Sequence, residues 1–263
     1  MCRRNLGGIV FSLLAVVPTI DAAGQKDTIS VKKHNLLTSY IKEGTSQFLS
    51  FTQDEKTKAI TAYSIQERTV KFGNRNGLPV IIVIQHRHLN DSTMSKYVYT
   101  VSDRQNFQTI YDYTYRIVSG IEAYSYTDRS VAGADSVKNN TKNKFIYNFD
   151  GGPPYCAELN VETVCALPIR RTGQKFKVPF YEPGLDYPAE YHDVAITGTE
   201  RLQTVNRGFI DCWVVRIAYD KDSHDDFWIS RSRHEFLKLE SHSPGLFFSR
   251  VKLFNSDVNR FFN

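Results

Sequence analysis

Apolar and polar residues alternate with period two along most of the chain after Gln47. Alternation of this kind places successive side chains on opposite faces of a β-strand. It predicts strands over 57–72, 80–88, 96–102, 107–118, 121–127 and 144–149, with polar turns between them. Further strands over 209–219, 226–230, 235–241 and 246–254 are joined by short turns, which is typical of an antiparallel meander.

Helical spacing occurs in one segment, residues 31–42. Its apolar residues recur as on one helix face, at Leu36, Leu37, Tyr40 and Ile41. Gly44 is placed to end a helix, although an irregular lead-in is the alternative. Because no helices are expected between the strands, a parallel α/β sheet is excluded. We predict an all-β fold, in which a large twisted antiparallel meander sheet forms a half-barrel with one short N-terminal helix.

The strongest breaks in the strand pattern lie at residues 151–154, which read Gly-Gly-Pro-Pro, and at residues 179–188. A domain boundary near residue 151 is one interpretation. However, the same strand pattern continues on both flanks, and neither break resembles a long flexible linker. We therefore predict a single β-rich half-barrel domain over residues 25–263.

Aromatic residues occupy alternate positions in several predicted strands, so each set lies on one face of its strand. Strand pairing in sequence order would join these faces. A buried tyrosine hydroxyl without a partner costs about 1–3 kcal/mol, so a tyrosine-rich face suits an amphipathic cavity or an interface. A plain hydrophobic core is the alternative. The candidate ligand-binding residues are Tyr97, Tyr99, Tyr111, Tyr113, Tyr115, Tyr124, Tyr126, Phe145, Tyr147 and Phe149.

Residues 1–22 have the organisation of a secretory signal peptide. Arg3 and Arg4 precede an apolar stretch, and cleavage is expected after Ala22 or Gly24. A membrane anchor is the alternative, but a stretch of about fifteen residues is shorter than the roughly 20 that cross a bilayer. We therefore expect an exported protein, periplasmic or extracellular, whose mature chain does not span the membrane.

The chain of 263 residues is 41% hydrophobic and 13% aromatic, which excludes a disordered, collagen-like or polytopic membrane protein. The formal net charge is only +5, and the basic residues form no continuous run in the sequence, so nucleic acid is not an expected partner. In an oxidising compartment Cys156 and Cys165 are candidates for a disulfide, provided that a turn or bulge lies between them. Cys212 is expected to be a small buried apolar residue.

The sequence contains no glycine-rich phosphate loop, no G-x-S-x-G motif and no H-E-x-x-H motif. His86 and His88 would share one strand face, where a metal could bind, but no third ligand follows at a suitable distance. The acidic segment 222–226 could hold a hard cation or could simply form a turn. We predict no catalytic residues, no metal and no cofactor.

Several short segments of the sequence resemble those of an exported bacterial domain family of unknown function. They are FYEPG at 180–184, YHDVAITGTERL at 191–202, DCWVV at 211–215, FWIS at 227–230 and HEFLKLE at 234–240. The family looks like the lipoprotein carriers LolA and LolB, in which a curved antiparallel half-barrel surrounds an apolar cavity. The resemblance spans about residues 30–255 and implies a cavity for an acyl chain or another apolar ligand. It implies no established activity, and this chain has no obvious lid helices beyond residues 31–42.

We predict a non-enzymatic periplasmic protein that binds an apolar or lipid-like ligand in the concave face of its sheet. The alternative is a cell-envelope interaction module that presents an exposed aromatic face to a protein or polysaccharide partner. Outward-facing tyrosines in the strand over 107–118 would favour the module. An enzyme would instead require His192, Asp193 and Glu200 to converge in one cleft.

Overall fold

The structure is a computed structural model that describes residues 26–185, 188–204 and 207–254, so the predicted signal peptide lies outside the described residues. The first part of the chain contains β1 (Asp27–Thr28), η1 (Val31–Lys33), η2 (Thr38–Tyr40), β2 (Gly44–Asp54), β3 (Ile60–Arg75), β4 (Leu78–Leu89), η3 (Ser92–Met94), β5 (Lys96–Asp103), β6 (Thr109–Arg116), β7 (Gly120–Tyr126), β8 (Ser130–Gly133) and β9 (Ile146–Asn148). The second part contains β10 (Tyr155–Cys156), η4 (Ala157–Leu159), α1 (Asn160–Cys165), β11 (Lys175–Tyr181), β12 (Glu190–Thr204), β13 (Gly208–Ala218), β14 (His224–Ser230), β15 (Phe236–Ser243) and β16 (Leu246–Leu253). The η elements are short 3-10 helices.

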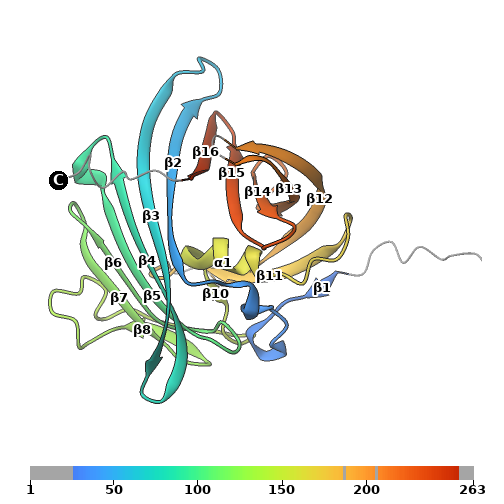
Figure 1. Ribbon diagram of the computed structural model, residues 1–263. Coiled ribbons are helices and arrows are strands. Elements are labelled where there is room, and N and C mark those ends of the chain that lie inside the picture. Colours follow the sequence, from blue (N-terminus) through green and yellow to red (C-terminus); the bar gives the residue numbers. More distant parts are fainter. Residues whose placement is uncertain (1–25, 186–187, 205–206, 255–263) are drawn as a thin grey trace, which may run out of the picture.

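The strands form one curved, unclosed sheet (Figure 1). Strands β2 to β9 are neighbours in chain order, as are β11 to β16, and the pairing of β16 with β2 joins the two series. All of these pairs are antiparallel, whereas β1 and β10 run parallel to β11. The predicted all-β half-barrel and its C-terminal meander are therefore confirmed. Strands before and after residue 151 belong to the same sheet.

The predicted N-terminal helix over 31–42 is wrong, because the segment forms only the two 3-10 turns η1 and η2. His34 ends η1 in a left-handed conformation at φ 48°. The Asn35 side chain then binds the backbone at Thr28 and Ser30, which competes with helix continuation. The segment is thus the irregular lead-in that was the alternative.

The core fills the concave side of the sheet around α1, which lies between the two arms of the sheet (Figure 1). Val161 and Val164 of α1 belong to the same buried cluster as Ile81 of β4 and Val215 of β13. The helix is six residues long and buried over most of its length. A helix this short and this buried shows no amphipathic stripe, so the sequence pattern did not reveal it.

An aromatic cluster joins the two ends of the strand order, where the described residues form no backbone ladder. Tyr147 of β9 stacks on Tyr181 of β11 with ring centroids 5.2 Å apart, and Phe149 meets the same ring edge-on at 5.9 Å. The Tyr181 hydroxyl donates a hydrogen bond of 2.7 Å to the carbonyl oxygen of Leu185. Side-chain packing therefore holds this seam together.

Tyr181→Ala should lower the free energy of unfolding by about 3–5 kcal/mol, because it empties the centre of the seam cluster. Tyr181→Phe keeps the ring and should cost only about 0.5–1.5 kcal/mol, the usual net value of one hydrogen bond. Urea unfolding followed by tryptophan fluorescence measures both values. Equal losses for the two variants would contradict a seam held by ring packing.

Candidate functional site

Five of the ten candidate aromatic residues lie on the convex face of the sheet. Tyr97 and Tyr99 on β5 pair with Tyr115 and Tyr113 on β6, and the next ring along β6 is Tyr111. These side chains are partly exposed, up to 43% at Tyr115, whereas the residues between them, such as Thr100 and Asp112, are buried on the concave face. We call these five tyrosines the outer aromatic face. None of the five lines either of the two clefts described below.

The other five candidates lie on the opposite face, in or against the seam cluster: Tyr124, Tyr126, Phe145, Tyr147 and Phe149. The register between β6 and β7 causes the change of face, because Asp112 pairs with Tyr124 while Tyr113 pairs with Ala123. The prediction of one shared aromatic face is therefore wrong. The ligand-binding role of these residues stays a prediction.

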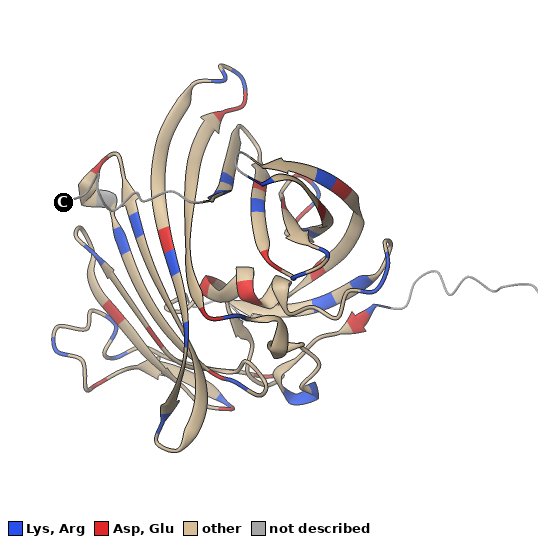
Figure 2. Cartoon of the chain, viewed as in Figure 1, with Lys and Arg blue, Asp and Glu red and all other residues tan. Residues whose placement is uncertain are grey.

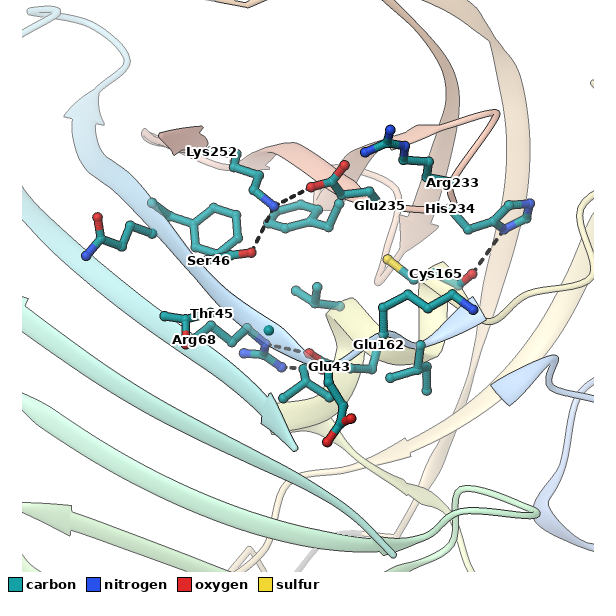
Figure 3. A pocket seen from close by; sticks show the side chains of 18 of the residues that line it. Glu43, Thr45, Ser46, Arg68, Glu162, Cys165, Arg233, His234, Glu235 and Lys252 are labelled. Atoms are coloured by element: carbon teal, nitrogen blue, oxygen red, sulfur yellow. Dashed lines mark hydrogen bonds and ion pairs between the residues drawn. The ribbon is translucent and has the colours of Figure 1, made fainter. Parts of the chain in front are cut away.

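A cleft of about 880 Å³ opens beside the start of β2, the end of β16, α1 and the turn before β15 (Figure 3). Its apolar wall includes Phe48, Val70, Val161 and Phe236. Charged side chains project beside this wall from strands on both sides and from α1 (Figure 3). The cleft therefore offers apolar and ionic contacts within one space. We call it the concave cleft.

A buried ion pair forms the deepest polar part of the concave cleft. The Nε of Arg68 donates a 2.7 Å hydrogen bond to Glu162, and its Nη2 contacts the other carboxylate oxygen and the carbonyl oxygen of Glu158. Both paired side chains are almost fully buried. Burial opposes the charged form, but the charge and hydrogen bonds of Glu162 outweigh it and raise the pKa of Arg68. Arg68 thus stays charged, and the pair fixes α1 to β3.

Lys252 of β16 lies between Glu235 and Ser46, donating to both (Figure 3). The turn before β15 carries the exposed Arg233 into the mouth of the concave cleft. Beside it, His234 stacks on Tyr40 with ring centroids 3.7 Å apart. Lys252 and Ser46, which meet in the polar wall of the cleft, are 206 residues apart in the chain.

A second, shallower cleft of about 630 Å³ adjoins the first and shares Arg207 and Arg233 with it. Arg207 lies over the ring of Phe254 at 4.7 Å, and Arg231 lies over the ring of Trp213 at 4.6 Å. The two clefts share Arg207, Arg233, His234 and Glu235, so their common rim carries two arginines beside one carboxylate. Arginines next to aromatic rings are suited to bind anions or the faces of planar groups.

Asp112 is a buried carboxyl on the concave face, where it accepts a 2.6 Å hydrogen bond from Thr100. Burial and then the charge of Glu158 raise its pKa to about 7, against the opposing effects of Thr100, Lys96 and Arg116. Figure 2 shows acidic residues on the α1 segment close to basic positions of neighbouring strands. Asp112 is thus the member of this charged interior that changes protonation near neutral pH.

The three described cysteines are free and buried, so Cys156 and Cys165 form no bridge in this structure. Helical segments η4 and α1 occupy the residues between them. At about 1.5 Å per residue they separate the two by on the order of 13 Å, beyond the roughly 4.4–6.8 Å Cα separation of a disulfide. The disulfide prediction is therefore corrected. Burial raises the pKa of both thiols, which keeps them protonated.

The other candidate groups are engaged elsewhere. His86 and His88 lie on the outer face with rings 6.3 Å apart, and Asp226 in the acidic segment holds Arg216 through two hydrogen bonds. Asp193 pairs with Lys26 and Lys177, while Glu200 accepts from Trp228. Among the described residues, no three histidines, cysteines or carboxylates are placed to hold a metal. No helix in the same part of the chain is long and apolar enough to cross a membrane.

Sequence reasoning missed the residues of the concave cleft. One signal was present: Arg68 stands between Gln66 and Val70 at a core-facing position of its strand, and the latter two are buried or half-buried. A charged residue at such a position needs a buried partner. Its partner Glu162 lies 94 residues further along the chain, in a helix that the pattern did not reveal.

No family model and no curated protein matches this sequence. Among solved structures, the chain is similar to the beta-barrel-like protein of domain of unknown function DUF1849 from Brucella abortus, with a TM-score of 0.50 and 7% identity over 82% of this chain and 100% of that chain. A DUF1329 family protein from Desulfovibrio piger has a TM-score of 0.36 and 9% identity, over 88% of this chain and 96% of that one. Such low identity shows the fold alone. The chain thus shares a fold with one β-barrel-like bacterial domain of unknown function, the DUF1849 protein, and its resemblance to LolA and LolB stays a prediction.

The free energy of unfolding should fall as pH rises from about 4 to 7, because the folded state holds a proton on Asp112 that the unfolded state releases near pH 3.8. Asp112→Asn removes this titration. Relative to the parent, the variant should gain on the order of 3 kcal/mol between pH 4.5 and pH 8. Urea unfolding at the two pH values measures the gain, with the exposed Asp128→Asn as control. Parallel pH profiles for parent and Asp112→Asn would refute the assignment.

Proposed function

We propose that the chain is an exported, non-enzymatic protein that binds an amphipathic, lipid-like molecule in the concave cleft. The observation that carries this proposal is the apolar wall of Phe48, Val161 and Phe236 beside the charged side chains of the same 880 Å³ space. The volume of the cleft falls within the roughly 300–1,000 Å³ that is typical of small-molecule sites, and its mixed apolar and charged lining suits a molecule with both kinds of group.

The basic rim gives the ligand an orientation. Arg207 and Arg233 are exposed at the mouth and form no ion pair within the described part of the chain. By contrast, Arg68 and Lys252 are already paired with carboxylates further in. An apolar chain therefore packs on the aromatic wall, while a polar or anionic head group remains at the rim.

The fold supports this proposal only in general terms. The sheet is curved and unclosed, the cleft opens beside the core on its concave side, and the structure from Brucella abortus shares this fold. For this ligand we therefore propose the residues in the walls of the concave cleft rather than the alternating tyrosines that the sequence suggested.

The outer aromatic face favours a second function, the cell-envelope interaction module. Tyr97 and Tyr113 meet edge-on at 6.1 Å, and Tyr99 and Tyr111 do so at 6.3 Å, which makes a contiguous and partly exposed surface. Exposed tyrosines combine apolar rings with hydroxyl groups, as is common at protein interfaces. A protein or polysaccharide of the cell envelope is the partner proposed for this face.

A bulky residue inside the concave cleft should block ligand binding. Ser46 faces the cleft, so Ser46→Trp should weaken the binding of a dansyl-labelled undecanoic acid at least tenfold, which is about 1.4 kcal/mol. Leu49→Trp is the matched control, because Leu49 lies on the same strand but is exposed on the convex face. Fluorescence titration gives both dissociation constants, and thermal unfolding checks that each variant folds.

The double variant Tyr99→Ser and Tyr113→Ser separates the two functions. It should bind the labelled fatty acid as the parent does but should lose retention on isolated cell-envelope material. Equal fatty-acid binding by Ser46→Trp and the parent, or no binding by either, would overturn the proposed ligand site.

A further inference from the structure

Two arginines on the concave face share one aromatic ring. Arg250 of β16 and Arg87 of β4 lie over the ring of Phe248 at 5.4 Å and 5.7 Å from its centroid. Between their strands, Ser50 of β2 and Ser64 of β3 are directly paired. The Nε of Arg250 donates to Ser50 and that of Arg87 donates to Ser64, each over 3.4 Å.

Neither arginine forms an ion pair in the described part of the chain. This contrasts with Arg68, which is held by both oxygens of Glu162. Two carboxylates act on Arg250 through their charge without forming an ion pair with it. Glu158 contacts Lys96, and Asp225 accepts from Tyr219 with one oxygen while its other oxygen has no hydrogen-bond partner among the described residues. Among the described residues, the polar contacts of the two guanidinium groups are therefore long ones to neutral hydroxyls, and the Phe248 ring is a further neighbour.

This arrangement is costly without a counter-ion. Burial and then the positive charges of Arg87 and Arg68 lower the pKa of Arg250 to about 9, although Glu158 and Asp225 oppose them. Burial likewise lowers the pKa of Arg87, again against Glu158. Both arginines are half-buried, and a charge that is partly withdrawn from water without a partner is destabilising, so an oxyanion at the site would relieve that cost.

The site is also accessible. Arg87, Phe248 and Arg250 each retain part of their exposed surface in the folded chain. Planar guanidinium groups bind carboxylates and phosphates through paired hydrogen bonds, and the two serine hydroxyls add further donors. The Phe248 ring lies beside both cations, where it can pack against the apolar body that carries the anion.

We propose that Arg87, Arg250 and Phe248 form an internal site for an oxyanion, either a carboxylate or a phosphate, carried on an apolar body or free. The site is distinct from the concave cleft, because neither arginine nor Phe248 lines that cleft. The proposal therefore does not require that the cleft binds a lipid.

The first test is thermal unfolding of the full chain with three probes at matched ionic strength. Inorganic phosphate carries the free oxyanion, laurate carries a carboxylate on an alkyl chain, and 1-dodecanol carries the chain without the charge. A ligand that binds only the folded state raises Tm with its concentration. Stabilisation by phosphate alone identifies a free oxyanion, and stabilisation by laurate alone identifies an anion on an apolar body. No stabilisation by either anion overturns the proposal.

The second test removes each charge at nearly constant length. Arg87→Met and Arg250→Met should each abolish at least nine-tenths of the anion-dependent rise in Tm. Without anion, their Tm should equal or exceed that of the parent, because an unpaired buried charge is removed. A purely structural role for the arginines predicts a lower Tm instead. Full anion response in both variants would contradict the assignment.

Two controls keep the test separate from the proposed function. Arg75→Met removes an exposed arginine that lies over Tyr111 at 5.0 Å on the outer face, and it should leave the anion response intact. Ser46→Trp blocks the concave cleft and should leave the phosphate response intact. If either arginine variant fails to fold, titration calorimetry of phosphate with Arg87→Lys and Arg250→Lys decides, since loss of the paired donors should weaken binding at least tenfold.

Discussion

The architecture depends on the pairing of β16 with β2, strands that lie about 200 residues apart in the chain. This ladder runs from Leu246 opposite Asp54 to Leu253 opposite Gln47, and it joins two meanders into one curved sheet. It also places Arg250 beside Ser50 and Lys252 within reach of Ser46. The concave cleft and the arginine pair both exist because of this single long-range register. A shift of one residue would move every one of these side chains to the convex face.

The two arms of the sheet present different chemistry to the interior. The arm from β11 to β15 contributes aliphatic and aromatic side chains such as Val178, Val215 and Phe227, which pack around α1. The arm from β3 to β6 contributes polar side chains such as Gln66, Thr100 and Asp112 at equally buried positions. Buried polar groups require partners, and α1 with η4 provides several of them. The helix therefore serves as core for one arm and as hydrogen-bonding partner for the other.

Strand positions followed from the sequence because alternation is a local property, and β4, β5 and the C-terminal meander lie within a few residues of their predicted ranges. The face of the sheet on which each strand places its aromatic residues is not a local property of the sequence. It depended on the register by which Asp112, rather than Tyr113, pairs with Tyr124. The prediction of a helix over residues 31–42 was wrong for a similar reason. The apolar spacing of the segment favoured a helix, but hydrogen bonds of the Asn35 side chain to the backbone compete with it. The ionic residues of the site come from segments far apart in the chain, Arg68 and Glu162 by 94 residues and Lys252 and Ser46 by 206, so no local pattern joined them.

The charges of the interior do not cancel. Arg68 is held by Glu162, Lys96 contacts Glu158, and Arg116 lies 3.4 Å from Glu122. Two more cations, Arg87 and Arg250, share the same face, and the carboxyl of Asp112 is partly protonated near neutral pH because its pKa is raised to about 7. The charge of the buried Asp225 opposes part of this excess of positive charge, and a low-dielectric interior amplifies the remainder. Packing alone gives no reason for a sheet to carry unpaired arginines there, whereas the binding of an anion does. The same logic distinguishes the interior from the convex face, where the tyrosines are partly exposed and their hydroxyls can be hydrated at little cost.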